Sequence, residues 1–279
     1  MQRAIDHIKK TLEGLYPDGE INAFSYLIIN HLRGYSKGEM IINRDKLFST
    51  DEQQRVYDIT QKLARYEPIQ YILGETIFYG LPFAVSIGVL IPRFETEELV
   101  DLIISENRNS AQLKIIDLGT GSGCIAVSLK KNLPDSQVWA CDLSEKALGI
   151  ASKNAMSNNC DVHFFLYDIL GTDMPDPSGF DILVSNPPYV TLKEKALMPE
   201  NVLNHEPYEA LFVPDNDPLL FYRAILEKSE TLLKAGGRVY FEINEAYGQE
   251  MLALMESFGF DSLIITDING KVRIAKGRK

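Results

Sequence analysis

The sequence predicts an α/β fold with a mainly parallel sheet, preceded by a small helical domain. From Glu95 onward, short apolar runs alternate with amphipathic segments, which is the pattern of a parallel sheet with helices on both faces. Before that, apolar side chains such as Ile21, Phe24 and Ile28 recur at helical spacing. These two patterns together favour two domains of different class.

The helical domain is expected over residues 1–74. Val56, Ile59 and Leu63 form a second apolar helix face, in addition to the one around Ile21. We expect this second helix to begin with a capping box made by Thr50 and Gln53 and to end before Pro68.

The segment between the two domains is expected to be a β-hairpin. Residues 77–85 alternate imperfectly around a Gly-Leu-Pro sequence, which is typical of two short strands joined by a turn. We therefore assign residues 75–92 to a linker and residues 93–279 to the α/β domain.

Seven apolar segments of the second domain are expected to be strands. They are residues 114–118, 137–141, 162–167, 180–185, 237–243, 262–266 and 272–275. In an open parallel sheet, ligands bind at the carboxyl ends of the strands, so the residues that follow each segment are the candidate site.

The tetrapeptide from Asn186 to Tyr189 follows the strand expected at 180–185. Two prolines, Pro187 and Pro188, fix φ and remove two backbone donors, so the carbonyls of Asn186 and Pro187 can accept hydrogen bonds. The Asn186 side-chain oxygen and a neighbouring carbonyl could take both hydrogens of a planar NH2 group, with Tyr189 packed on its face. A Pro-Pro turn that only ends a strand has the same sequence.

A glycine-rich loop follows the strand expected at 114–118. It consists of Gly119, Thr120, Gly121, Ser122 and Gly123. Alternate glycines let the backbone approach a ligand closely, and the amides that open the next helix offer donors. The G-x-G-x-G spacing differs from the G-x-G-x-x-G fingerprint of dinucleotide-binding sites, which disfavours NAD.

Two further strands are each followed by an aspartate. Asp142 is placed to accept both hydroxyls of a ribose, and Asp168 is placed to accept the exocyclic amine of an adenine. Aspartates at strand ends are also common helix caps, so each alone is weak support for a nucleoside site.

Taken in order, these four strand-end motifs resemble the S-adenosylmethionine-dependent methyltransferases that act on planar amino or amide nitrogens. Within that group the chain is similar to the release factor glutamine methyltransferases, the HemK/PrmC family, nearly from end to end. The segment Val89–Glu97 carries the most family-specific part of the resemblance, and residues 67–74, 205–207 and 267–270 support it.

The resemblance implies a Rossmann-like seven-stranded sheet with a C-terminal antiparallel hairpin. It also implies methyl transfer from S-adenosylmethionine, giving S-adenosylhomocysteine, to the N5 amide of the glutamine in the Gly-Gly-Gln motif of release factors. The helical domain would recognise the release factor. The residues expected to bind cofactor are Gly119, Thr120, Gly121, Ser122, Gly123, Asp142, Asp168, Ile169 and Asn186. Those expected to bind substrate are Asn186, Pro187, Pro188 and Tyr189, of which Asn186, Pro187 and Tyr189 are also the expected catalytic residues.

Three residues depart from the family pattern, and the segment 213–218 lacks the glycines that are usual there. Phe94 stands where a second proline is usual, Ile169 where an aromatic is common, and Asn244 where a glycine is common. We expect the Phe94 loop to differ in shape, Ile169 to supply aliphatic packing, and Asn244 to lie outside the site.

Composition excludes several other classes. The chain has 279 residues, is 45% hydrophobic and carries a formal charge of −11, with no Lys/Arg block for a phosphate backbone. We expect a cytoplasmic enzyme, because residues 1–16 lack a signal peptide core and no run of about 18 apolar residues is present. The three cysteines and four histidines show no zinc spacing, so no metal is expected.

Three alternatives stay open on the sequence alone. A nucleic-acid methyltransferase acting on adenine or guanine amino groups would keep the chemistry and change the substrate, against which the acidic charge argues. A NAD-type oxidoreductase or a non-catalytic binding module would keep only the fold.

Overall fold

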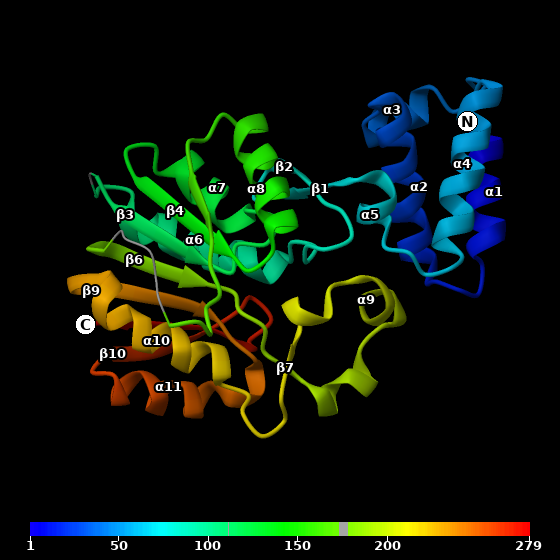
Figure 1. Ribbon diagram of the computed structural model, residues 1–279. Coiled ribbons are helices and arrows are strands. Elements are labelled where there is room, and N and C mark those ends of the chain that lie inside the picture. The colour runs from blue at the N-terminus through cyan, green and yellow to red at the C-terminus, as the bar shows by residue number, and fades with distance from the viewer. Residues whose placement is uncertain (111, 173–177) are drawn as a thin grey trace. The chain divides into compact units, whose positions relative to one another are not determined.

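The computed structural model describes residues 1–110, 112–172 and 178–279, and the chain in it forms two compact units (Figure 1). The first unit contains Met1–Gly74 and also Pro199–His205. The second contains Glu75–Met198 and Glu206–Lys279. Each unit has its own hydrophobic core.

The first unit is entirely helical. Its helices are α1 (Gln2–Leu12), α2 (Asp18–Arg33), α3 (Lys37–Ile42), α4 (Thr50–Leu63), α5 (Ile69–Leu73) and α9 (Glu200–His205). Ile8, Leu12, Ile28 and Leu63 are nearly or completely buried between them, which confirms the helical spacing read from the apolar residues.

The capping box of α4 lies one residue earlier than the sequence predicted. Ser49, not Thr50, is the N-cap, and its hydroxyl accepts from the Glu52 amide while the Glu52 carboxylate accepts from the Ser49 amide. Ser49 with Glu52 and Thr50 with Gln53 both have the spacing of a capping box. The box that forms is the one in which the acidic residue, Glu52, also makes an ion pair with Arg33, at 2.6 Å.

The second unit begins with the predicted hairpin, β1 (Glu75–Phe78) and β2 (Leu81–Ala84), paired antiparallel. Its turn is not the Gly-Leu-Pro sequence but Tyr79-Gly80, both with positive φ, as a two-residue type I′ turn requires. Leu81 and Pro82 belong to β2, where proline is tolerated because this two-stranded sheet has only edge strands.

The main sheet has seven strands in the order β10-β11-β9-β6-β3-β4-β5. The strands are β3 (Lys114–Leu118), β4 (Gln137–Asp142), β5 (His163–Leu166), β6 (Phe180–Ser185), β9 (Leu233–Glu242), β10 (Asp261–Thr266) and β11 (Val272–Arg278). β11 alone runs opposite to the other six strands, so its pairings with β9 and β10 are antiparallel. The predicted mainly parallel sheet with a closing antiparallel hairpin is confirmed.

Helices cover both faces of this sheet (Figure 1). They are α6 (Phe94–Asn107), α7 (Cys124–Asn132), α8 (Glu145–Ser157), α10 (Leu220–Leu232) and α11 (Gly248–Ser257). The shorter elements are β7 (Val190–Thr191), paired with β8 (Phe212–Val213), and the single turns η1 (Leu192–Leu197), η2 (Tyr208–Ala210) and η3 (Glu245–Tyr247).

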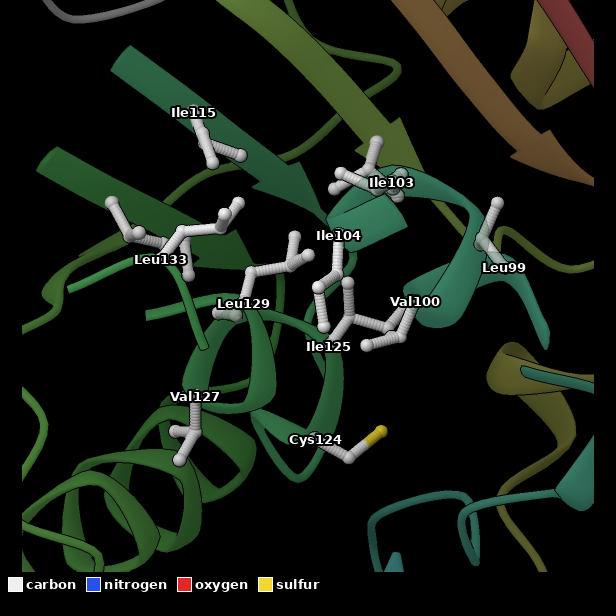
Figure 2. Packing of buried hydrophobic residues seen from close by; sticks show 14 of the residues in the cluster. Leu99, Val100, Ile103, Ile104, Ile115, Cys124, Ile125, Val127, Leu129 and Leu133 are labelled. Carbon is white, nitrogen blue, oxygen red and sulfur yellow. The ribbon is translucent and has the colours of Figure 1, made fainter. Parts of the chain in front are cut away.

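Successive residues of the central strands enter two separate cores. On β3, Ile115 packs with α6 and α7, whereas Ile116 packs with α10 and α11. Figure 2 shows the first of these cores, in which Ile104 of α6 and Leu129 of α7 lie near Ile115. Because both faces are buried, the central strands read as continuous apolar runs, which is why the sequence identified them.

The parallel arrangement brings the carboxyl ends of the parallel strands to one edge of the sheet. β3, β4, β5, β6 and β9 all run in the same direction, so the segments that follow them meet there. Among the described residues, no helix is long and apolar enough to cross a membrane.

Candidate active site

The loop from Asn186 to Tyr189 leaves the carboxyl end of β6. Pro187 is buried and Asn186 is half-buried, so the loop is held against the protein. The Asn186 side-chain amide donates from Nδ2 to Thr96 Oγ1 at 3.2 Å. This bond turns Oδ1, the acceptor atom of the same side chain, away from Thr96.

A buried carboxylate lies behind this loop. Glu242, the last residue of β9, is 1% exposed. Its Oε2 accepts from the Thr96 hydroxyl at 2.6 Å and its Oε1 from the Tyr189 hydroxyl at 3.0 Å. Burial raises the pKa of Glu242, although these hydrogen bonds and the positive charge of Arg273 oppose the rise.

Tyr189 is fixed at both its ends. Its hydroxyl is bonded to Glu242, and burial followed by the charge of that carboxylate raises its pKa well above the ordinary value. Its backbone carbonyl accepts from Asn244 Nδ2 at 3.2 Å, and Asn244 Nδ2 also lies 3.0 Å from Glu194 Oε1. The expectation that Asn244 lies outside the site was therefore wrong, because a residue after the end of β9 reaches the loop after β6.

The glycine loop after β3 has left-handed backbone at each glycine: φ is +77° at Gly119, +55° at Gly121 and +80° at Gly123. Its amides are largely used within the protein. Those of Gly119 and Thr120 donate to the Cys141 carbonyl, each at 2.9 Å, and that of Gly123 to the Thr120 carbonyl at 2.8 Å. The glycines thus allow the left-handed backbone and let a ligand come close to the loop, and they supply few free amide donors.

Thr120 and Ser122 alternate with these glycines and are buried, with exposed fractions of 4% and 2%. The Thr120 hydroxyl donates to Asp117 Oδ2 at 2.6 Å, so this side chain stabilises the loop from below. Burial raises the pKa of Asp117 to about 7, with the Thr120 hydrogen bond opposing.

The first of the two strand-end aspartates is tied to the glycine loop. Asp142 Oδ2 accepts from the Gly121 amide at 2.8 Å, and Oδ1 accepts from the Ser144 amide at 2.9 Å. Burial raises the pKa of Asp142 in spite of these bonds. The structure thus brings Asp142 and Gly121 together across two strand ends.

Asp168 and Ile169 follow β5 and differ in exposure. Asp168 is exposed, with Oδ1 accepting from the Leu170 amide at 2.9 Å. Ile169 is 8% exposed, and its Cδ1 would lie 3.6 Å from a Cβ on Gly119, so the two residues are neighbours. Ile169 therefore borders the glycine loop.

Phe94 is the first residue of α6 and is 81% exposed. Proline is favoured at this first helical position, so a helix begins here with either residue. Beside it, Arg93 pairs with Glu206 at 2.6 Å, and Glu206 also accepts from the Ile91 amide at 3.2 Å. The Arg93–Glu206 pair thus fixes the segment before α6.

The sequence did not single out two residues of this site, Thr96 and Glu242. Thr96 lies in the family-specific segment but has no chemical pattern of its own. Glu242 did leave a signal, a carboxylate inside the apolar run Val239–Ile243, which is costly to bury without partners.

Within residues 1–110, 112–172 and 178–279, no group of three or more His, Cys, Asp or Glu side chains is placed to hold a metal ion. Cys124 and Cys141 are buried free thiols, and burial raises the pKa of Cys124 to about 12.

The comparison with known proteins identifies the family. Residues 96–206 match the methyltransferase small domain and residues 3–74 match the PrmC N-terminal domain. A methyltransferase from Pyrococcus furiosus has a similar fold, with a TM-score of 0.53 and 17% identity, covering 83% of this chain and 99% of that one. At this identity the likeness concerns the fold alone.

Two relatives are much more similar in sequence, and both are named release factor glutamine methyltransferase. The protein of Bacteroides thetaiotaomicron is 48% identical over 98% of each chain. That of Flavobacterium psychrophilum is 44% identical over 96% of this chain and 95% of its own. The chain belongs to the release factor glutamine methyltransferase family.

Proposed function

We propose that this protein transfers a methyl group from S-adenosylmethionine to the side-chain amide nitrogen of the glutamine in the Gly-Gly-Gln motif of peptide chain release factors. The observation that carries the proposal is the orientation of Asn186. Its NH2 group is taken by Thr96, which leaves the acceptor Oδ1 for a substrate amide. The names of the relatives at 48% and 44% identity supply the substrate.

The residues at the strand ends fit the proposed cofactor. A Cβ on Gly121 would meet no atom within 4 Å, so a ligand has room beside the loop. Asp142 is half-buried beside that space, and its carboxylate oxygens have lone pairs left for the ribose hydroxyls. Asp168 and Ile169 would hold the adenine by a hydrogen bond and by apolar contact. The bound cofactor would supply a methyl group already activated on its sulfonium.

The substrate side of the reaction is assigned to the loop after β6. An amide nitrogen is a poor nucleophile because its lone pair is shared with the carbonyl. Asn186 Oδ1 and the Pro187 carbonyl would accept both of its hydrogens, which orients the nitrogen and stabilises the positive charge that develops on it. Tyr189, held by Glu242 and Asn244, would pack on the face of the amide.

Positioning is the main contribution expected of the protein. The loop would hold the nitrogen at roughly 3 to 3.5 Å from the carbon it attacks, in line with the leaving group. No dedicated base is then required, because the amide nitrogen would be strongly acidic once it carries the methyl group and would release its extra proton to water. The helical domain over residues 1–74 is proposed to recognise the release factor, and residues 75–92 to link it to the catalytic domain over residues 93–279.

The Asn186→Ala variant tests the role of the loop. Methyl transfer should fall by about two orders of magnitude or more, since one of two acceptors aimed at the reacting group is lost. Cofactor affinity by calorimetry should change much less. Asn109→Ala, at an exposed position after α6, is the matched control and should behave as wild type. A proportional loss of transfer and affinity would place Asn186 in the cofactor pocket alone.

The substrate is tested by offering the wild-type protein labelled S-adenosylmethionine with a release factor, or with bulk RNA and DNA. Mass spectrometry then locates the methyl group. One methyl on the glutamine of the Gly-Gly-Gln motif supports the proposal. Label only in nucleic acid would keep the chemistry and replace the substrate.

A further inference from the structure

We propose that Thr96 and Glu242 are positioning residues that set which way the Asn186 amide points, so that an acceptor and not a donor faces the substrate. This inference rests on the proposed function and deepens it, because it assigns the preference for a substrate NH2 group to two residues that need not touch the substrate. A chain of hydrogen bonds runs from Glu242 through Thr96 to Asn186.

The first step is the carboxylate. In its ionised form, Glu242 has acceptors only, and it lies within hydrogen-bond distance of two hydroxyls, those of Thr96 and Tyr189. In the structure each hydroxyl donates its single hydrogen to Glu242. Because Glu242 is only 1% exposed, water has little access to replace either hydroxyl as its hydrogen-bond partner.

The second step is the threonine. Thr96 is 2% exposed, and its hydroxyl hydrogen is donated to Glu242. The hydroxyl oxygen can therefore only accept a hydrogen bond from Asn186. The Asn186 atom 3.2 Å away must then be the NH2 group, as observed. With the amide flipped, two acceptor oxygens would face each other at that distance.

The third step is the consequence for the substrate. The two ends of an amide are opposite in character, so fixing Nδ2 on Thr96 fixes Oδ1 on the other side. Oδ1 and the Pro187 carbonyl then present two acceptors, which suit the two hydrogens of a glutamine amide. A carboxylate, which has no hydrogens to donate, would be repelled by the same pair of oxygens.

Glu242, at which this chain of hydrogen bonds begins, is itself held by several elements. The Tyr222 hydroxyl, on α10, donates to the Glu242 backbone carbonyl at 2.9 Å, and Tyr222 is 1% exposed. Thr96 comes from the first turn of α6, and Tyr189 from the loop after β6. Three elements thus converge on the end of β9, which gives the Asn186 amide a rigid reference.

The test compares Thr96→Val with Thr96→Ser. Valine keeps the β-branched shape and removes the hydroxyl, whereas serine keeps the hydroxyl. With a release factor at pH 8, we expect Thr96→Val to lower kcat roughly 10- to 100-fold, the range for leaving one buried polar group without its hydrogen bond. The KM for S-adenosylmethionine should stay within about twofold. Thr96→Ser should recover most of the wild-type kcat.

The orientation itself is measured without substrate or turnover. In protein labelled with nitrogen-15, the Asn186 side-chain NH2 signals should be shifted and slow to exchange in wild type and in Thr96→Ser. In Thr96→Val they should exchange at least tenfold faster. If Thr96→Val keeps wild-type kcat and exchange, the positioning role is wrong. If wild type fails to methylate the release factor, the proposed function fails, while the exchange experiment still decides the orientation.

Discussion

Two alanine substitutions in the glycine loop, at Gly121 and Gly123, should cause similar backbone strain, although the space around the two residues differs. Gly121 and Gly123 both have left-handed backbone, with φ of +55° and +80°. Alanine in this conformation costs about 1–2 kcal/mol at either position. Any further difference between Gly121→Ala and Gly123→Ala must come from what the added methyl group meets.

At Gly123 the methyl group meets the protein. A Cβ there would lie 2.9 Å from the Ala151 Cβ and 3.1 Å from its Cα, which belongs to the backbone of α8. Overpacking of this kind costs roughly 1–3 kcal/mol. With the strain, Gly123→Ala should lose about 2–5 kcal/mol of unfolding free energy.

At Gly121 the methyl group meets nothing within 4 Å, so the expected stability loss is the strain alone, about 1–2 kcal/mol. The open space is where we propose that the cofactor lies. Gly121→Ala should therefore bind S-adenosylmethionine at least tenfold more weakly, or about 1.4 kcal/mol.

Urea unfolding and titration calorimetry on both variants separate the two effects. The expected pattern is a larger stability loss in Gly123→Ala and a loss of affinity in Gly121→Ala that its smaller stability loss does not explain. Wild-type affinity in Gly121→Ala would show that the loop does not border the cofactor. Equal stability losses would refute the packing argument for Gly123.

Two further predictions concern the aspartates. Asp142→Ala should weaken S-adenosylmethionine binding at least tenfold by calorimetry, because it removes the proposed ribose acceptor and the partner of the Gly121 amide; unchanged affinity would rule out the ribose assignment. The pKa of Asp117, raised to about 7 from an ordinary 3.8, means that the folded state holds a proton that the unfolded state releases. The contribution of this proton to the free energy of unfolding is fully present below about pH 4 and is lost as the pH rises through 7; it is at most about 4 kcal/mol. In urea unfolding, Asp117→Asn should therefore lose less stability between pH 4 and 8 than wild type. Parallel pH curves would contradict this.

The sequence was sufficient for the fold because the decisive signals are local. Strands buried on both faces, such as β3 and β6, are short apolar runs in the sequence. The motif at the end of each strand directly follows that run in the chain. Where two local patterns competed, the sequence could not choose. The capping box formed at Ser49 and Glu52 beside the equivalent pattern at Thr50, and the hairpin turned one residue before its expected sequence.

The second layer of the site could not be predicted, because it is made by tertiary contacts. Thr96 and Glu242 are 146 residues apart in the chain and meet only when α6 packs against β9. Asn244 likewise reaches Tyr189 across 55 residues. Hydrogen bonds at such separations depend on strand order and register, which side-chain pattern alone does not encode.

A crystal structure of the protein with S-adenosylhomocysteine and a release factor carrying the Gly-Gly-Gln motif would test the central claim most directly. We predict that the glutamine amide nitrogen lies about 2.7–3.2 Å from both Asn186 Oδ1 and the Pro187 carbonyl oxygen, with Asn186 Nδ2 still bonded to Thr96. A glutamine bound away from this loop, or facing the NH2 group of Asn186, would contradict it.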